Sequence, residues 1–267
     1  MTPPETGRIY QGDCLELMRS WPDECVELTV TSPPYDNLRA YKGYSFDFEN
    51  VAQQLFRITK RGGVCVWVVG DAVIDGSESG TSFRQALRFL DVGFRLHDTM
   101  IYQKNSCPFP ESNRYNQAFE YMFVLSRDTP KTFNPKRRKN ILTGGVNKTS
   151  SSNRQPDGTI APMKYELNKE DSIEWNVWRY EVGFMKSSSD PRAYEHPATF
   201  PEKLAADHIA SWSNPGDLVF DPFTGSGTTP LQAARLGRRF VGCEIAPEYA
   251  ALAATRVAEE IAQGKLF

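Results

Sequence analysis

The C-terminal part of the chain constrains the fold more than any other segment. A strand-like stretch, residues 218–223, leads into Gly225-Ser226-Gly227, and a helix-like stretch follows at 228–236. A second strand-like stretch at 240–245 and a long helix-like stretch at 247–263 continue the pattern. Strands that alternate with helices predict a mostly parallel sheet covered on both faces. We therefore expect an α/β fold with a doubly wound sheet.

The same alternation occupies the N-terminal half. Residues 25–30 are rich in β-branched side chains and end at Thr31 and two prolines, which predicts a strand running into a tight loop. Further helices are expected at 48–60, 82–90 and 201–211, and further strands at 64–69, 95–103 and 118–125. A chain of 267 residues is near the upper size for one hydrophobic core. We expect one domain formed by residues 1–125 and 192–267, interrupted by an insertion at 126–191.

The expected insertion is polar and lacks periodicity. It contains Gly144-Gly145 and the serine-rich run 149–153, so we expect a functional segment whose serine-rich part is mobile until a ligand binds. Between Thr129 and Pro156 there is no Asp or Glu, while the basic residues are Lys131, Lys136, Arg137, Arg138, Lys139, Lys148 and Arg154. The net charge of the whole chain is −2, so phosphate binding requires such a local patch. A merely solvated basic loop is the alternative.

Composition excludes several classes of protein. With 40% hydrophobic and 24% charged residues, and without a signal peptide or an apolar run that could span a bilayer, the chain is expected to be cytoplasmic. The cysteines lack the spacing of a zinc site and the density of a disulfide framework, so we expect no metal and no disulfide. They are Cys14, Cys25, Cys65, Cys107 and Cys243.

A strand, a glycine turn and a helix together suit a nucleotide-like ligand. The glycines permit close backbone approach, and the helix N-terminus favours a negative group. Glu244 lies nineteen positions after Gly225, at the end of the next strand, where it could accept hydrogen bonds from both ribose hydroxyls. A dinucleotide fingerprint would place a third glycine where Pro230 stands, and a phosphate-binding loop would need Gly-Lys-Ser/Thr. These differences favour an adenosyl cofactor over either rival and over a turn that binds nothing.

Three strings carry a resemblance to a known family. Thr31-Ser32-Pro33-Pro34-Tyr35 resembles the catalytic motif of DNA amino-methyltransferases, and the run from Asp221 to Thr229 resembles their S-adenosylmethionine motif. The run from His196 to Leu204 resembles their motif X. A catalytic motif that precedes the cofactor motif is typical of the circularly permuted β-class. The resemblance covers residues 9–104 and 194–261 but not the insertion.

The resemblance implies the residues that bind S-adenosyl-L-methionine. Asp13 would face the adenine amino group, although it is equally suited to cap the following helix. Phe223 and the loop glycines would surround the methionine part, Glu244 would hold the ribose, and motif X would close the pocket. The implied cofactor-binding residues are Asp13, Thr31, His196, Pro197, Phe200, Asp221, Pro222, Phe223, Gly225, Ser226, Gly227, Thr228 and Glu244.

The implied catalytic residues are Ser32, Pro33, Pro34 and Tyr35. The lone pair of an exocyclic base amine is delocalised, so hydrogen-bond acceptors must stabilise the positive charge that develops on nitrogen during attack. The Ser32 hydroxyl and the Pro33 carbonyl supply two acceptors, the prolines make the loop rigid, and Tyr35 would stack on the base. The target base must leave the duplex to reach the cofactor. A rigid proline turn without catalytic function is the alternative.

The target base stays open at this point. Serine at the first motif position is commoner among cytosine-N4 enzymes, and aspartate or asparagine among adenine-N6 enzymes. Methylation of cytosine carbon 5 is disfavoured because that chemistry needs a cysteine after a proline, whereas Cys107 precedes Pro108.

The predicted function is sequence-specific methylation of double-stranded DNA by a bacterial or phage-encoded enzyme. Residues 1–125 would be the catalytic half, 126–191 the target-recognition insertion and 192–267 the cofactor half. The enzyme would serve a restriction-modification system with a separate endonuclease, or act alone, and homodimers are common in this class. Two alternatives are a DNA-binding protein with a degenerate site and a methyltransferase for RNA or protein amides. Binding to RNA but not to duplex DNA would favour the latter.

Overall fold

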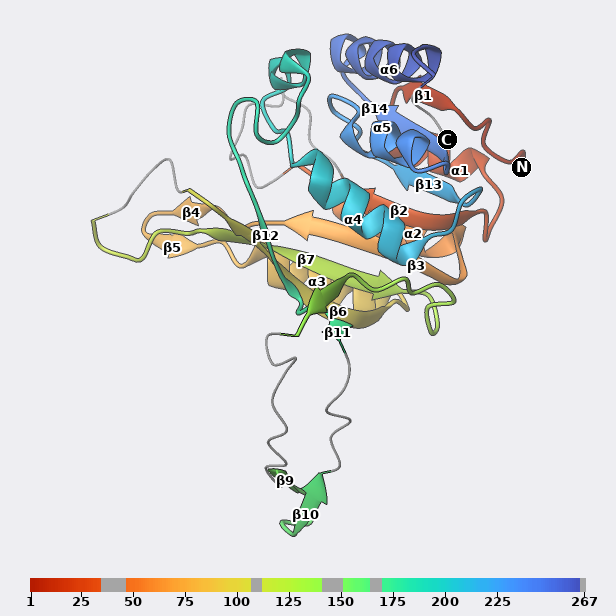
Figure 1. Ribbon diagram of the computed structural model, residues 1–267. Helices are drawn as coiled ribbons and strands as arrows, with labels where there is room; N and C mark the ends of the chain where they lie inside the picture. The colour runs from red at the N-terminus through yellow and green to blue at the C-terminus, as the bar shows by residue number, and fades with distance from the viewer. Residues whose placement is uncertain (35–46, 107–111, 141–150, 164–169, 265–267) are drawn as a thin grey trace. The chain divides into compact units, whose positions relative to one another are not determined.

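The computed structural model spans residues 1–267 and describes 1–34, 47–106, 112–140, 151–163 and 170–264 (Figure 1). The chain forms two compact units. The larger unit comprises Met1–Asn134 and Asn176–Phe267, and the smaller unit is Pro135–Trp175.

An eight-stranded sheet organises the larger unit. Its order is β1-β14-β13-β2-β3-β7-β6-β12. β7 runs antiparallel to both of its neighbours, and the other neighbouring pairs are parallel. In chain order the strands are β1 (Arg8–Gln11), β2 (Val26–Thr31), β3 (Thr59–Val69), β6 (Arg95–Lys104), β7 (Phe119–Ser126), β12 (Val177–Tyr180), β13 (Leu218–Asp221) and β14 (Arg239–Glu244).

Helices cover both faces of this sheet. α1 (Cys14–Ser20), α2 (Phe48–Ile58) and α3 (Thr81–Asp91) share one apolar core, in which Trp67 and Phe89 are fully buried. α4 (Glu202–Trp212), α5 (Thr228–Arg235) and α6 (Pro247–Ala262) contribute to the second core, around Met122 and Leu204. In Figure 1, α4 lies in front of the sheet and α3 behind it. The predicted doubly wound, mostly parallel α/β fold is confirmed.

The topology brings the two distant sequence strings together. β13 and β2 are neighbours, and the chain continues from β13 to β14 on one side and from β2 to β3 on the other. In open α/β sheets a ligand site forms beyond the carboxyl ends of strands where the winding direction changes. Ser32 follows the end of β2, and Pro222 follows the end of β13.

The insertion is shorter than expected. The predicted boundaries 126–191 included β12, which pairs with β6 in the main sheet, so residues 176–191 belong to the larger unit. In the run Val-Trp-Arg-Tyr, Trp178 and Tyr180 are buried while Val177 and Arg179 are exposed. This alternation is a strand signal, and the surrounding polar residues obscured it.

The smaller unit contains two short antiparallel pairs. β8 (Arg137–Lys139) pairs with β11 (Asp171–Ile173), and β9 (Ser151–Arg154) pairs with β10 (Ile160–Met163). Of the serine-rich run expected to be mobile, 149 and 150 lie outside the described residues, and 151–153 belong to β9. The larger unit also contains the hairpin β4 (Val73–Ile74) and β5 (Ser77–Glu78) and the short helix η1 (Pro191–Glu195). Within the described ranges, no helix has the length and apolar character needed to cross a membrane.

Candidate active site

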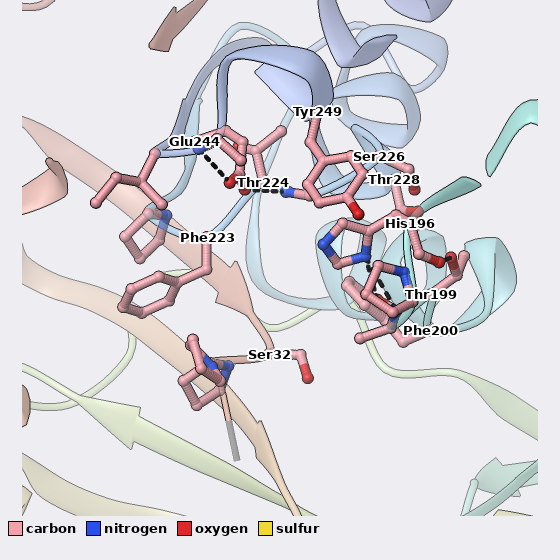
Figure 2. A pocket seen from close by; sticks show the side chains of 18 of the residues that line it. Ser32, His196, Thr199, Phe200, Phe223, Thr224, Ser226, Thr228, Glu244 and Tyr249 are labelled. Atoms are coloured by element: carbon pink, nitrogen blue, oxygen red, sulfur yellow. Dashed lines mark hydrogen bonds between the residues drawn. The ribbon is translucent and has the colours of Figure 1, made fainter. Parts of the chain in front are cut away.

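A cavity of about 680 Å³ opens at the carboxyl edge of the sheet in the larger unit. This volume is within the roughly 300–1,000 Å³ of small-molecule sites. Most of the residues predicted for catalysis and cofactor binding line it. They are Asp13, Ser32, Pro33, Pro34, His196, Pro197, Phe200, Pro222, Phe223, Gly225, Ser226, Thr228 and Glu244. The structure therefore joins strings that lie far apart in the sequence (Figure 2).

The glycine loop after β13 adopts backbone conformations that favour glycine. Gly225 has φ 53° and Gly227 has φ 90°, both in the left-handed region. A side chain at Gly225 would meet the His196 ring at 3.0 Å, and one at Gly227 would meet Ala253 at 3.0 Å. The loop thus approaches its neighbours closely and leads into α5, whose N-terminus favours a negative group on a ligand.

Glu244 fixes the glycine loop and faces the cavity. Its Oε2 accepts a hydrogen bond from the Gly225 amide at 2.9 Å, and its Oε1 accepts one from the Ala246 amide at 2.9 Å. Burial raises the pKa of Glu244, and the two amides oppose that rise. Each carboxylate oxygen can accept more than one hydrogen bond, so both retain capacity for ribose hydroxyls. These acceptors fit the ribose hydroxyls of an adenosyl cofactor.

Three predicted residues lie behind the cavity wall. Thr31, Asp221 and Gly227 are not among the residues that line the cavity. The Thr31 hydroxyl donates to Asp221 Oδ1 at 2.6 Å, and the Phe223 amide donates to the same oxygen at 3.0 Å. Burial raises the pKa of Asp221 to about 6. The Thr31–Asp221 hydrogen bond spans 190 positions and ties the end of β2 to the end of β13.

The motif X segment forms another wall. The Ala198 amide donates to His196 Nδ1 at 3.1 Å, and the imidazole packs edge-on against Tyr249 with ring centroids 4.5 Å apart. Tyr249 and Thr199 also line the cavity, and sequence reasoning did not select them. Tyr249 lies in the first turn of α6, inside the region of resemblance, but that resemblance assigned it no role. Figure 2 shows His196, Phe200 and Tyr249 along one side.

Asp13 both caps a helix and lines the cavity. It is the N-cap of α1, where its carboxylate accepts a hydrogen bond from the Leu15 amide at 2.7 Å. It also lines the cavity. A capping carboxylate keeps free lone pairs, so capping does not prevent a contact with an amino group of a ligand.

The predicted catalytic loop lies across the cavity from Glu244. Ser32, Pro33 and Pro34 line the cavity, and Figure 2 shows Ser32 facing it on the opposite side from Glu244. Tyr35, the fourth predicted catalytic residue, lies outside the described residues.

A buried arginine behind the cavity ties the glycine loop to the segment before α4, and sequence reasoning missed it. Arg256 of α6 donates to the Ser226 carbonyl and, at 2.9 Å, to Asp190 Oδ2. It also donates to Ser188 Oγ and Glu202 Oε1, each at 3.3 Å. Its side chain is 1% exposed. An arginine within the long helix predicted at 247–263 gave no signal, because its acidic partners are distant in sequence.

The predicted DNA-binding residues, Lys136, Arg137, Arg138, Lys139, Lys148 and Arg154, belong to the smaller unit, whereas Lys131 of the same basic run belongs to the larger one. Of these, Lys148 lies outside the described residues. Arg137 forms an ion pair with Asp171 at 2.7 Å, and Arg138 lies over the Trp175 ring and 3.8 Å from Glu174. Lys139 and Arg154 are exposed, and Lys136 is half-buried. The lack of Asp and Glu between Thr129 and Pro156 was therefore misleading. The pairing of β8 with β11 brings carboxylates from outside this segment next to its basic residues.

The described cysteines are Cys14, Cys25, Cys65 and Cys243, and all are free thiols. Burial raises the pKa of each, to about 12 for Cys14. These thiols are consequently poor nucleophiles at neutral pH. Among the described residues, no group of His, Cys, Asp and Glu side chains could hold a metal ion.

The fold and this cavity define an S-adenosylmethionine-dependent methyltransferase of the permuted β-class. Residues 26–255 match the profile of the N6/N4 DNA methylase family, and the chain belongs to this family. It is similar to the orphan methyltransferase M.BamHII of Bacillus amyloliquefaciens, at 54% identity over 88% of this chain and 89% of that one. It is also similar to the type II methyltransferase M.PvuII of Proteus hauseri, at 29% identity over 94% of this chain and 83% of that one.

Solved structures agree with these sequence comparisons. The DNA modification methylase TTHA0409 of Thermus thermophilus, solved with S-adenosyl-L-methionine, aligns with a TM-score of 0.62 and 28% identity over 95% of both chains. PvuII DNA methyltransferase aligns with a TM-score of 0.69 over 98% of this chain and 94% of that chain. At 24% identity the latter likeness shows the fold alone. The predicted family, cofactor and DNA substrate are confirmed.

Proposed function

We propose that this protein methylates cytosine N4 in double-stranded DNA by direct transfer from S-adenosyl-L-methionine. The observation that carries the proposal is the shared cavity, in which the Ser32–Pro33–Pro34 loop faces the glycine loop and Glu244. The Thr31–Asp221 hydrogen bond fixes the strand ends that present the two groups.

In this mechanism, Ser32 and Pro33 activate the amine. The Ser32 hydroxyl and the Pro33 carbonyl accept hydrogen bonds from the two N–H groups and stabilise positive charge on nitrogen as it attacks. When bound, the cofactor would supply an electrophilic methyl group on a sulfonium. The N–C bond would replace the S–C bond, and the proton lost by the amine would pass to water. Because burial raises the pKa values of Cys14, Cys65 and Cys243, none of these three thiols forms an adduct in the proposed reaction.

Two observations favour cytosine over adenine. Serine stands at the first position of the catalytic motif, as is commoner among cytosine-N4 enzymes. The relative M.PvuII is 29% identical, and the PvuII methyltransferase structure is described as cytosine-N4-specific. Nucleoside mass spectrometry of DNA treated with the purified enzyme tests this choice directly.

We also propose that the smaller unit contacts the recognition sequence. In this unit Lys139 and Arg154 are exposed, and Arg137 and Arg138 are paired with Asp171 and Glu174. The enzyme would act alone, as the name of M.BamHII states for that relative, or beside a separate endonuclease. Sequencing that detects modified bases in treated genomic DNA would give the recognition sequence.

Replacing Ser32 with alanine tests the catalytic assignment. We expect turnover to fall by about 10²- to 10³-fold, the loss typical when one preorganised electrostatic partner is removed. Affinity for S-adenosyl-L-methionine, measured by calorimetry, should change little because Ser32 lies across the cavity from Glu244. Ser77→Ala, in the exposed hairpin strand β5, is the matched control. Full activity in the Ser32 variant would contradict the proposal.

A further inference from the structure

The cavity extends beyond the catalytic loop to a charged pair that no recognised motif includes. Lys104 at the end of β6 and Glu120 near the start of β7 line it, and Lys104 Nζ lies 2.6 Å from Glu120 Oε1. Their side chains are 25% and 15% exposed, respectively. A charged pair held this far from water is costly unless its groups are used or fully paired.

Sheet order places this pair opposite the cofactor groups. β2, which leads to Ser32, has β13 and β14 on one side and β3, β7 and β6 on the other. Glu244 and Glu120 are therefore each two strands from β2, roughly 10 Å at the usual strand spacing. A base whose amine lies at Ser32 with the methyl donor on the Glu244 side has its ring toward Glu120 and Lys104.

We propose that Lys104 recognises the flipped base and that Glu120 positions the Lys104 ammonium, an inference that rests on the proposed function. An ammonium has three donors and no acceptor. Cytosine presents two acceptors, N3 and O2, in sequence beside its amine, and both match that donor. Adenine offers N1 followed by a C–H group, and guanine places an N–H donor beside its amine. The pair therefore selects cytosine.

The chain provides a matched pair for comparison. Lys60 of β3 and Glu27 of β2 form another ion pair between neighbouring strands, away from the cavity. Glu27 also accepts a hydrogen bond from the Leu218 amide, so it keeps a partner when Lys60 is replaced. Lys60→Met removes the same charge as Lys104→Met without touching the cavity.

The experiment uses the full-length enzyme and a duplex that carries the mapped methylation site. For Lys104→Met we expect kcat/KM for DNA to fall about tenfold or more, with unchanged affinity for S-adenosyl-L-methionine. The variant should bind a duplex with an abasic site at the target position as tightly as wild type, because no base is there to contact. For Glu120→Gln, which is nearly isosteric, kcat/KM for DNA should fall by a smaller factor. This variant tests the inference if Lys104→Met does not fold.

Three results would overturn the inference. One is equal kcat/KM in the Lys104 and Lys60 variants. Another is an equal loss of affinity for normal and abasic duplexes, which would indicate a structural role. A wild-type product of N6-methyladenine would contradict both this inference and the proposed cytosine target, while leaving DNA amino-methyl transfer intact. Absence of any methylated base with wild-type enzyme would instead contradict the proposed function.

Discussion

Two sets of arginine–carboxylate contacts lie in very different surroundings. At the cavity, Arg256 is 1% exposed and contacts Asp190 and Glu202. In the smaller unit, Arg137 and Asp171 are 48% and 46% exposed. Removing one partner of a buried charge pair strongly destabilises the fold, whereas an exposed pair contributes little to stability. The first set can fix a shape, and the second is free to exchange its carboxylate for phosphate.

The electrostatics of Asp190 show how strongly the cavity network is coupled. Burial alone would raise the pKa of Asp190, but hydrogen bonds from Arg192 and Arg256 hold it at about 2. Arg256 also contacts the Ser226 carbonyl in the cofactor loop. The network therefore connects the stability of the fold to the geometry of the cofactor site.

The largest expected effect follows from replacing Arg256. Arg256→Met should reduce the free energy of unfolding by about 3 kcal/mol, the lower end of the loss for one side of a buried charge pair, because Asp190 keeps Arg192 and Glu202 keeps Arg235. It should also weaken binding of S-adenosyl-L-methionine, since the glycine loop loses the contact of Arg256 with the Ser226 carbonyl and is left with that of Glu244 with Gly225. Urea unfolding and calorimetry measure the two losses.

Two controls sharpen this prediction. Arg192 contacts Asp190 and Glu259 but is 41% exposed, so Arg192→Met should lose far less stability and leave cofactor affinity intact. Arg256→Lys keeps the charge but not the planar set of donors, and it should give an intermediate loss. Equal stability of the Arg192 and Arg256 variants would remove the distinction between the two regions.

The buried carboxylate of Asp221 has no arginine partner, and we expect it to give an effect of intermediate size on the pH dependence of stability. Burial raises the pKa of Asp221 to about 6, above its ordinary value of 3.8. The folded state thus retains a proton that the unfolded state releases, so stability contributed by Asp221 is present below pH 3.8 and is lost as pH rises to about 6. Between these limits, wild type should lose roughly 3 kcal/mol relative to Asp221→Asn.

Urea unfolding across this pH range measures the Asp221 effect. The asparagine Oδ1 can still accept hydrogen bonds from Thr31 and the Phe223 amide, so the variant should fold. Comparing slopes rather than absolute stabilities removes any constant effect of the amide. Asp91→Asn, at an exposed carboxylate in α3, controls for loss of a charge. The prediction would be contradicted if the free energy of unfolding changed with pH by the same amount in wild type and in Asp221→Asn.

Sequence reasoning reached those parts of the site that depend on local pattern. A strand, two glycines with positive φ and a helix identify the cofactor loop because each element leaves its own residue types in the chain. Arg256 and Lys104 escaped notice because their partners come from other elements, and only the folded topology brings them together. Asp171 shows the converse, since its contact with Arg137 weakens a patch that looked purely basic.

The smallest expected effect tests the exposed pairs of the smaller unit. Arg137→Ala should leave the thermal unfolding midpoint unchanged and weaken DNA binding similarly for all sequences. If Arg137 exchanges Asp171 for a phosphate, the slope of log affinity against log salt should become shallower by about 0.9. Asp171→Ala should act in the opposite direction and strengthen binding, because the competing carboxylate is gone.

The control for this last prediction is Arg8→Ala. Arg8 forms an exposed ion pair with Glu5, at 55% and 69% exposure, but it lies in the larger unit. Removing it subtracts the same charge from the protein, so any change due to net charge alone appears in both variants. Equal salt slopes for the Arg137 and Arg8 variants would mean that Arg137 contacts no phosphate. The exposure of Arg137 and Asp171 would then explain only why breaking their ion pair costs little stability. DNA contact would have to come from other basic residues such as Lys139 or Arg154.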